Sequence, residues 1–359
     1  MSLNEVKVSA PGRICLFGEH QDYLGLPVIS AAISLFINIK ALKTNDRNLT
    51  INLLDLNQQR IIPLTNREVH YQYSRDYLCS SYNLFIRKGY RLNQGYHCKV
   101  QGNIPINAGV ASSSALVIAW ITFLAKIFKA QLTLTQIAEL GYQAEVGEFH
   151  ESGGRMDHYT TTLGKILYIT SKPPFKYERL NVPLKGLVLG DSLEPKDTVA
   201  DLTQIKKQIQ IGISRLCCYY KKFNLQTTSI QDISKYLSLL PTEIANCITA
   251  TLVNRDLTQK AKKLLTSNNF SSKAFYTLLD LHHMQLAQNL RISTPKIEKL
   301  IIAAKDAGAL GCKINGSGFG GSMIAYAPEC TEDVGKAIEK AGGKSYNLSI
   351  CEGVQVYKS

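Results

Sequence analysis

Hydrogen-bonding side chains lie on both sides of an apolar segment in the stretch Ala10-Pro11-Gly12-Arg13-Ile14-Cys15-Leu16-Phe17-Gly18-Glu19-His20-Gln21-Asp22-Tyr23. Residues 6–9 and 14–17 are predicted to be strands, because apolar residues alternate or run together there. An Arg, a Glu, a His and an Asp then fall within ten residues of the chain. Donors and acceptors gathered at the end of a strand suit a polyhydroxylated ligand.

The chain is long enough for two domains. It has 359 residues, of which 45% are hydrophobic, so a sizeable core can be buried. The clearest break in the apolar pattern is Ser171-Lys172-Pro173-Pro174-Phe175, because consecutive prolines mark a turn or loop. We therefore predict an N-terminal domain over residues 1–175 and a C-terminal domain over residues 176–359.

Charge and cysteine content limit the partners and the compartment. The 41 basic and 28 acidic residues give a net charge of +13, but they are scattered, which argues against nucleic acid and leaves a nucleoside triphosphate as a sufficient acidic partner. The nine cysteines show no C-x-x-C spacing and favour a reduced, cytoplasmic protein. The first residues do not resemble a signal peptide, and the apolar run 115–124 is too short to cross a bilayer, so no membrane partner is expected. The sequence leaves the oligomeric state open and is compatible with a monomer.

A second informative segment is Pro105-Ile106-Asn107-Ala108-Gly109-Val110-Ala111-Ser112-Ser113-Ser114-Ala115, which leads into an apolar helix predicted for residues 113–130. Small residues let a backbone approach a bulky anion, and a helix N-terminus offers unpaired N–H groups. Hydroxyl groups there can bind phosphate oxygens or a magnesium ion. A serine-rich helix cap is the alternative, and three serines alone favour it. No Gly-Lys-Ser/Thr follows, so the segment is not a Walker A loop.

Two carboxylates mark a third segment. Asp157 lies in Ser152-Gly153-Gly154-Arg155-Met156-Asp157-His158, and a carboxylate there can accept a proton from a substrate hydroxyl. Glu145 lies twelve residues earlier, at the end of a predicted helix that a capping box of Thr133 and Gln136 opens. A turn with a solvated Asp and a surface Glu on a helix are the simpler interpretations of these residues taken alone.

A glycine-rich loop forms the fourth segment, Gly311-Cys312-Lys313-Ile314-Asn315-Gly316-Ser317-Gly318-Phe319-Gly320-Gly321. Taken alone, it is either a flexible turn or a concave set of backbone N–H groups that binds phosphate. It follows a helix predicted to begin at Thr294-Pro295 and to end near Gly308, and it precedes a strand predicted at residues 322–326.

Taken in order, these segments resemble the signatures of the GHMP family of small-molecule kinases, and of galactokinases in particular. The first segment fully matches the Glu-His-x-Asp-Tyr of galactokinases. In the second, Pro105 and Gly109 have the motif's spacing before the small-residue run, although Ala111 stands where a Ser is usual. The third matches the galactokinase stretch Cys-Gly-Ile-Met-Asp-Gln in part, including its Asp157. The fourth shares the Gly-x-Gly-Phe-Gly-Gly core.

The resemblance implies an α+β fold, the GHMP kinase fold, with an N-terminal ribosomal-protein-like domain, a C-terminal ferredoxin-like domain and the active site between them. It also implies ATP as co-substrate and Mg. His283 matches a family histidine and is predicted to pack rather than to catalyse. The implied catalytic residues are Asp157 and Arg13; the substrate-binding residues are Glu19, His20, Asp22 and Gly154; the ATP-binding residues are Gly109, Ser112, Ser113 and Ser114; the metal ligands are Ser113 and Glu145.

The implied reaction is phosphorylation of a sugar hydroxyl, the anomeric 1-OH of galactose or of a related sugar. Mevalonate kinases share Gly-Glu-His in the first signature but lack the Asp-Tyr, which favours a sugar. Arg155 adds a cation beside the predicted base, so an anionic acceptor such as a uronic acid or a phosphosugar is an alternative. Arabinose and a mevalonate-like acceptor are further alternatives. A sensor that binds galactose and ATP without catalysis is the other class of function. The serines, Glu145 and Asp157 favour the enzyme.

Overall fold

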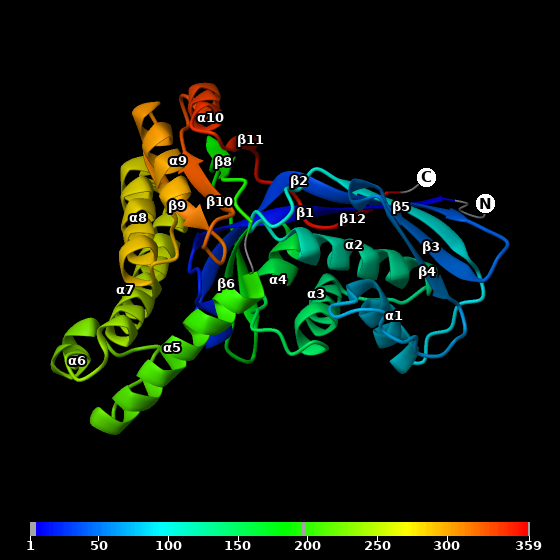
Figure 1. Cartoon of the computed structure of the whole chain (residues 1–359), viewed down its shortest axis with the longest axis horizontal. Helices are drawn as coiled ribbons and strands as arrows, with labels where there is room; N and C mark the ends of the chain where they lie inside the picture. The colour runs from blue at the N-terminus through cyan, green and yellow to red at the C-terminus, as the bar shows by residue number, and fades with distance from the viewer. Residues whose placement is uncertain (1–4, 196–197, 358–359) are drawn as a thin grey trace.

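Two β-sheets organise this protein. The structure is a computed structural model that describes residues 5–195 and 198–357, with an eight-stranded and a four-stranded sheet. Figure 1 shows the larger sheet lying over three helices, which are α1 (Tyr77–Arg87), α2 (Ser112–Ile127) and α3 (Leu134–Tyr142). The smaller sheet and the longer helices form the other part of the molecule. The predicted α+β class is confirmed.

The larger sheet is mostly antiparallel. Its strands are β1 (Glu5–Phe17), β2 (Val28–Lys43), β3 (Asn48–Leu53), β4 (Gln58–Pro63), β5 (Tyr96–Gly102), β6 (Ile166–Thr170), β7 (Lys176–Leu180) and β12 (Gln355–Tyr357). The main order is β12-β1-β2-β5-β3-β4, and β6 joins β2 to β7. Only β3 and β5, among the described strands, pair in parallel.

The strands predicted at residues 6–9 and 14–17 form one strand, β1. Its pairing with β2 continues across the Pro-Gly pair through a register shift between Pro11 and Gly12. The shift brings β1 against the serine-rich segment: Arg13 N donates to Val110 O at 3.1 Å, and a Cβ on Gly12 would lie 2.9 Å from the same oxygen. Glycine at position 12 therefore permits the contact that places the end of β1 beside the start of α2.

Helix α2 is enclosed on most sides, which explains why its sequence is apolar nearly all round. Its buried side chains pack with the inner face of β1, β2, β3 and β5 and with α1 and α3. Trp120 lies at the centre of this core, and its indole N–H donates to Leu78 O at 3.1 Å. The helix is therefore a rigid support for the loop at its N-terminus, and its observed bounds lie close to the predicted range.

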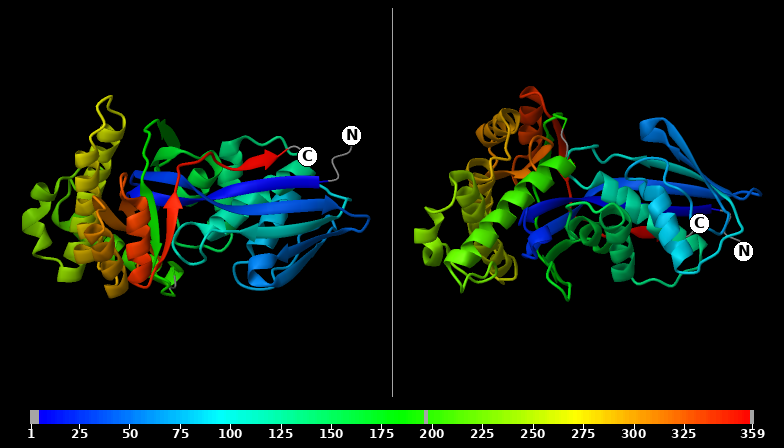
Figure 2. Two further views of the ribbon diagram at one scale, coloured as in Figure 1. Left: turned by 90° about the horizontal axis from the view of Figure 1, so that it is seen from above. Right: turned by 60° about the horizontal axis from the view of Figure 1, so that its bottom comes forward.

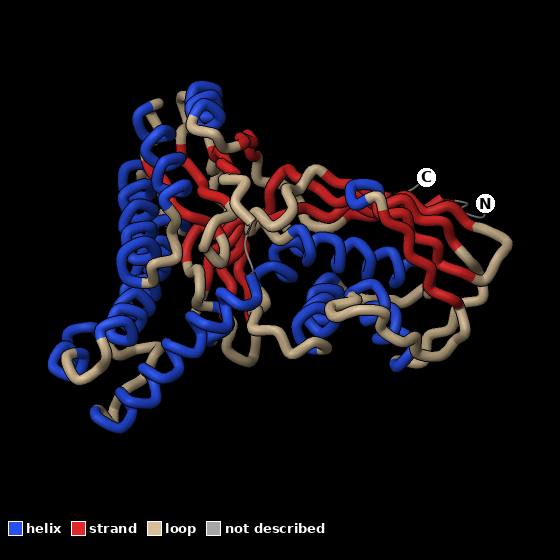
Figure 3. The backbone as a smooth tube through the Cα atoms, in the orientation of Figure 1, coloured by secondary structure: helices blue, strands red, loops and turns tan. Residues whose placement is uncertain are grey.

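The smaller sheet has the ferredoxin-like arrangement that the sequence predicted. Its strands β8 (Leu187–Asp191), β9 (Gly311–Asn315), β10 (Ser322–Tyr326) and β11 (Lys344–Leu348) lie in the order β11-β8-β10-β9, all antiparallel. Figure 3 shows most of the helices of this part gathered on its outer side. The helices of this part are α5 (Thr198–Tyr219), α6 (Ile230–Leu237), α7 (Thr242–Leu265), α8 (Ser272–Met284), α9 (Pro295–Asp306) and α10 (Thr331–Lys340).

The chain changes sheets later than the predicted domain boundary. Residues 171–175 connect β6 to β7, which pair antiparallel in the larger sheet, and the smaller sheet begins only at β8. Near its end the chain returns to the larger sheet, where β12 lies beside the beginning of β1 (Figure 2). We therefore propose a division between Leu180 and Leu187, with β12 belonging to the N-terminal part. In the described part of the chain no helix is long and apolar enough to cross a bilayer.

Candidate active site

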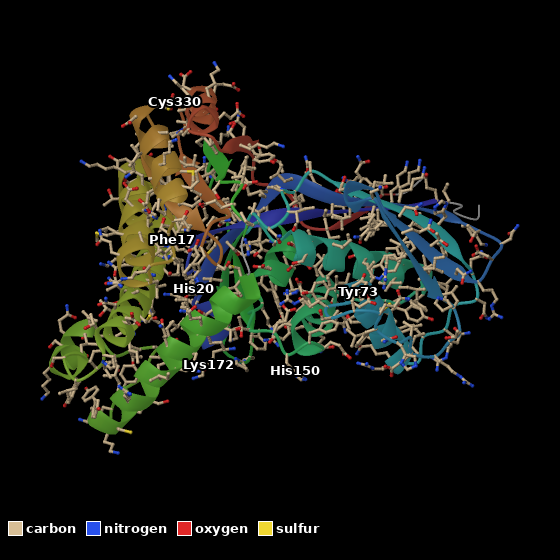
Figure 4. The ribbon with its side chains drawn as sticks, viewed as in Figure 1. Phe17, His20, Tyr73, His150, Lys172 and Cys330 are labelled. Carbon is tan, nitrogen blue, oxygen red and sulfur yellow. The ribbon has the colours of Figure 1, made fainter. Side chains whose placement is uncertain are left out.

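One cavity of about 360 Å³ gathers every site residue that the sequence predicted. It lies where the end of β1, the start of α2, the start of α4 (Met156–Leu163) and the loop after β9 come together. The predicted residues that line it are Arg13, Glu19, His20, Asp22, Gly109, Ser112, Ser113, Ser114, Glu145, Gly154 and Asp157. Figure 4 places the labelled His20 near the junction of the two parts of the molecule.

Arg13 and Asp157 form a bidentate ion pair. The Arg13 Nε lies 2.6 Å from Asp157 Oδ1, and Nη2 lies 2.8 Å from Oδ2. The Arg13 side chain is buried, whereas Asp157 is partly open to the cavity. The third nitrogen, Nη1, donates to the carbonyl of Gly109. One guanidinium therefore orients the carboxylate and holds the serine-rich loop, which a point-like ammonium could not do.

The start of α2 presents uncapped backbone N–H groups. No side chain of the described residues caps its first turn, so the first N–H groups are available to a ligand. Ser113 is exposed, Ser112 is half-buried and Ser114 is buried. Ala111 precedes the helix with φ of 61°, a left-handed conformation that is strained for a residue with a Cβ. Such strain is common in segments whose backbone is shaped for a ligand.

Residues at the two ends of the glycine-rich loop donate hydrogen bonds to backbone carbonyls of the serine-rich loop. Asn315 Nδ2 donates to Gly109 O at 2.9 Å, and Ser322 Oγ donates to Ala108 O at 2.6 Å. Gly316 has φ of 80°, and a Cβ there would lie 2.8 Å from Gly109 O. Glycine is therefore required at position 316 for both its conformation and its closeness to the serine-rich loop.

Asp22 and Gly154 meet at one side of the cavity. A Cβ on Gly154 would lie 2.0 Å from Asp22 Oδ2, so only glycine allows this approach. Asp22 accepts backbone N–H groups from Tyr23 at 2.9 Å and from Met156 at 3.3 Å. Burial, and then the nearby Asp157 charge, raises the pKa of the Asp22 carboxyl to about 6. Two carboxylates thus face one cavity, which suits a ligand that donates several hydroxyl hydrogens.

Glu19 and His20 line the cavity but also make strong contacts within the protein. Glu19 forms a buried ion pair with Lys313 of β9, and its Oε2 lies 3.6 Å from His282 Nε2. The His20 ring nitrogens lie 2.8 Å from Tyr23 Oη and 3.0 Å from Ser317 O. These contacts fasten the loop after β1 to the C-terminal part of the protein.

Glu145 lies in a π-helical turn, Gln143–Gly147, that continues α3. Its Oε2 lies 2.8 Å from Nε2 of His158, the residue after Asp157, and both side chains are buried. π-Helical turns occur often at functional sites, because the extra residue redirects a side chain. Here the turn directs Glu145 to the cavity that the serines also line.

The structure argues against the interpretation of Arg155 as an anion-binding residue. Its Nε lies 2.9 and 3.2 Å from the two oxygens of Glu139, which neutralises the charge. The centroids of the Tyr142 and Phe175 rings each lie 3.8 Å from its Cζ. A substrate anion would have to compete with Glu139 and with both rings.

Residues that contact the site but were not singled out from the sequence include Lys313, Asn315 and His158. The sequence did hold a signal that Lys313 needs a buried partner, because the residue stands between the apolar residues Cys312 and Ile314. The predicted packing role of His283 agrees with its contacts, since Ile314 N lies 3.3 Å from its Nδ1 and Glu298 Oε1 lies 3.2 Å from its Nε2.

The fold and the cavity, with its serine-rich, glycine-rich and carboxylate segments, define a small-molecule kinase. The chain belongs to the GHMP kinase family. The family descriptions "GHMP kinases N terminal domain" and "GHMP kinases C terminal" match residues 76–165 and 259–345. The "Galactokinase galactose-binding signature" matches residues 3–41.

Curated relatives carry two different names. The chain is 28% identical over 374 residues to the galactokinase of Staphylococcus saprophyticus, with 98% of this chain and 95% of that protein covered. It is 26% identical over 364 residues to the mevalonate kinase of Pyrococcus furiosus, with 98% of both covered. These identities are too similar to decide the acceptor.

Solved structures confirm the fold. The galactokinase of Lactococcus lactis, complexed with galactose, has a TM-score of 0.85 and 19% identity, and the match covers 98% of this chain and 95% of that one. A mevalonate kinase has a TM-score of 0.73 and 21% identity, covering 96% of this chain and 98% of that one.

Proposed function

We propose that this protein is a sugar kinase that transfers the γ-phosphoryl group of ATP to the anomeric 1-OH of galactose or of a closely related neutral sugar. The observation that carries the proposal is the joint placement of Asp157, Asp22 and the start of α2 around one cavity. Asp157 accepts the hydroxyl proton as the sugar oxygen bonds to the γ-phosphorus, and the bond from that phosphorus to the bridging oxygen of ADP breaks.

The serine-rich loop supplies the nucleotide site. Gly109, Ser112, Ser113 and Ser114 would bind the phosphates together with the open N–H groups of α2. The Ser113 hydroxyl and the Glu145 carboxylate line the same cavity, and oxygen donors of this kind fit Mg²⁺. When bound, Mg²⁺ would neutralise negative charge on the phosphates. Arg13 keeps Asp157 oriented and places a fixed positive charge beside the transferring group.

Sugar binding is assigned to Asp22, Gly154, Glu19 and His20. Asp22 is the most direct candidate, because it accepts hydrogen bonds from the backbone N–H groups of Tyr23 and Met156 and borders the cavity at Gly154. Glu19 is bonded to the C-terminal part and would present its remaining lone pairs from a fixed position. Both ring nitrogens of His20 are engaged, so His20 would contact the sugar through the edge or face of its fixed ring.

A neutral acceptor suits the charges around the cavity better than an anionic one. Asp22 and Asp157 both border it. The arginines in its lining are already paired, Arg13 with Asp157 and Arg75 with Glu151 at 3.3 Å. The carboxylate of mevalonate or of a uronic acid would therefore meet like charges. The match to the galactose-binding signature over residues 3–41 supports the same choice.

The unpaired thiols of all nine cysteines, each within the described residues, support a cytoplasmic location.

A coupled assay of ADP release tests the proposal. Galactose, arabinose, galacturonate, glucuronate, a heptose phosphate and mevalonate are compared at equal concentration with ATP and Mg²⁺. Galactose or arabinose is expected to give the highest kcat/KM. A higher kcat/KM for mevalonate or for a sugar acid would overturn the choice of a neutral sugar. If galactose and ATP both bind by calorimetry and no acceptor releases ADP, the protein is a sensor.

A further inference from the structure

Arg155 is a charged residue two positions before Asp157 that the proposed reaction does not use, and it sits at the N-cap position of α4. Its side chain is held on three sides. Glu139 of α3 binds its Nε, the Tyr142 ring covers its Cζ at 3.8 Å, and the Phe175 ring of the β6–β7 connection covers it at the same distance. These contacts join α3, α4 and the β6–β7 connection at one guanidinium.

Two further contacts fasten the same turn of α4. Tyr159 Oη donates to Glu139 Oε1 at 2.6 Å, so Glu139 holds both Arg155 and the residue one turn later. The Tyr142 ring also meets the His158 ring edge to face, with centroids 5.8 Å apart. Tyr142 therefore contacts residues on both sides of Asp157.

This turn carries the groups that would face the acceptor. The Asp157 carboxylate projects from it to Arg13. Its Met156 N–H donates to Asp22 Oδ2, and Gly154 packs against that carboxylate. A displacement of the turn would move Asp157 and Asp22 together relative to the serine-rich loop.

We propose that Arg155 is a positioning residue, which fixes the first turn of α4 and thereby sets the geometry of Asp157 and Asp22 around the acceptor. The inference rests on the proposed function, because it takes Asp157 as the base. Lysine could keep the charge but not the planar stacking between two rings or the directed Nε–H bond, so it cannot replace arginine here. Displacements of about 1 Å at a reacting group can lower turnover by about a hundredfold.

The test compares R155K and R155M with wild type and with a matched control, R87K. Arg87 also binds carboxylates, those of Glu68 and Glu148, but it lies outside the cavity lining. R155K and R155M are expected to lower kcat by about tenfold to a hundredfold while the KM values for sugar and ATP stay within about threefold. R87K is expected to change neither.

Two outcomes would overturn the proposal. A raised sugar KM at constant kcat would assign Arg155 to substrate binding, and a lower melting temperature at constant kcat would assign it to stability alone. Hydrogen exchange gives a readout that does not need activity. Faster exchange confined to residues 153–160 in R155K, and absent in R87K, supports the positioning role even if no acceptor is turned over, and unchanged exchange there contradicts it.

Discussion

Asp157 owes its position to Arg13, whose guanidinium also contacts the loop proposed to hold the phosphates. In the proposed reaction, the carboxylate would thus meet the acceptor in a fixed orientation relative to the transferring group. Replacement by Asn keeps the shape of the side chain but removes the proton acceptor.

We expect D157N to lower kcat by about a hundredfold to ten-thousandfold, which is the usual contribution of a general base. Binding of ATP and sugar should persist, as measured by calorimetry. Since Asn leaves Arg13 without its counter-charge, the melting temperature of the variant is measured in parallel. A folded D157N protein that keeps full turnover would exclude Asp157 as the base.

Asp22 makes stability depend on pH. Burial and Asp157 raise the pKa of Asp22 from 3.8 to about 6, so the unfolded chain loses this proton at lower pH than the folded protein does. The group therefore costs stability as the pH rises from about 4 to about 6, and the cost persists above that range. D22N, which does not ionise, should gain stability relative to wild type over this window. Urea unfolding at pH 4 and pH 7 measures the difference, and an equal difference at both pH values would show that Asp22 does not titrate in this way.

The π-helical turn at residues 143–147 and the first turn of α4 act together through Glu145 and His158. A donor bonded to a metal-ligating carboxylate typically fixes its orientation and tunes its affinity. His158 stands where galactokinases have a Gln, and Gln also carries a donor.

H158A is expected to weaken Mn²⁺ binding to the complex with ATP by about tenfold to a hundredfold, measured by water proton relaxation. H158Q should retain most of the affinity because it keeps a donor near Glu145. H150A changes an exposed histidine of the same segment and serves as the control. Equal Mn²⁺ affinity in H158A and wild type would show that His158 does not support the proposed metal site.

Strand β9 contributes a buried charge that joins the two parts of the protein. Lys313 is fully buried and donates to Glu19, to Cys15 O at 3.0 Å and to Ile314 O at 2.8 Å. K313M should lower the free energy of unfolding by about 3–5 kcal/mol, because it leaves Glu19 buried without its cation. The double variant E19Q/K313M should recover part of that loss.

A surface pair supplies the comparison for this prediction. Lys305 binds Asp280 at 2.9 Å with both side chains partly exposed, and K305M should cost less than about 1 kcal/mol. Denaturant unfolding measures all of these variants. A K313M variant as stable as K305M would show that Glu19 does not depend on Lys313.

Local elements could be predicted where the chemistry of a few neighbouring residues determines them. Thr133 and Gln136 form the expected capping box, and Thr294 caps α9 with Pro295 in its first turn. Helix α7 was not predicted from the sequence, because it lacks an apolar stripe. Polar residues such as Asn254, Arg255 and Thr258 are buried along it. The sequence predicted two strands, one on each side of Pro11, where the structure has the single strand β1. The register shift that lets β1 continue across the Pro-Gly pair depends on its pairing with β2, which no local pattern reveals.

At the scale of the whole molecule, the site is held by bonds between residues distant in the chain. Cys15 N donates to Asn315 Oδ1 at 2.9 Å across 300 positions, and Lys313 reaches Glu19 across 294. No local pattern predicts such partners. The residues predicted for the site do line the cavity, because each lies in a short motif whose order in the chain resembles that of GHMP kinases, whereas other lining residues such as Tyr77 and Leu202 lie in no such motif. The partners that hold those residues, such as His158 and Lys313, became visible only in the folded structure.

The most direct test of the central claim is to identify the phosphorylated product by ³¹P NMR, with proton coupling, after incubation with ATP, Mg²⁺, and galactose or mevalonate in parallel. A resonance coupled to the anomeric proton, formed from galactose faster than any product forms from mevalonate, is the expected result. Phosphomevalonate as the sole product, or phosphate on a hydroxyl other than the anomeric one, would contradict the account.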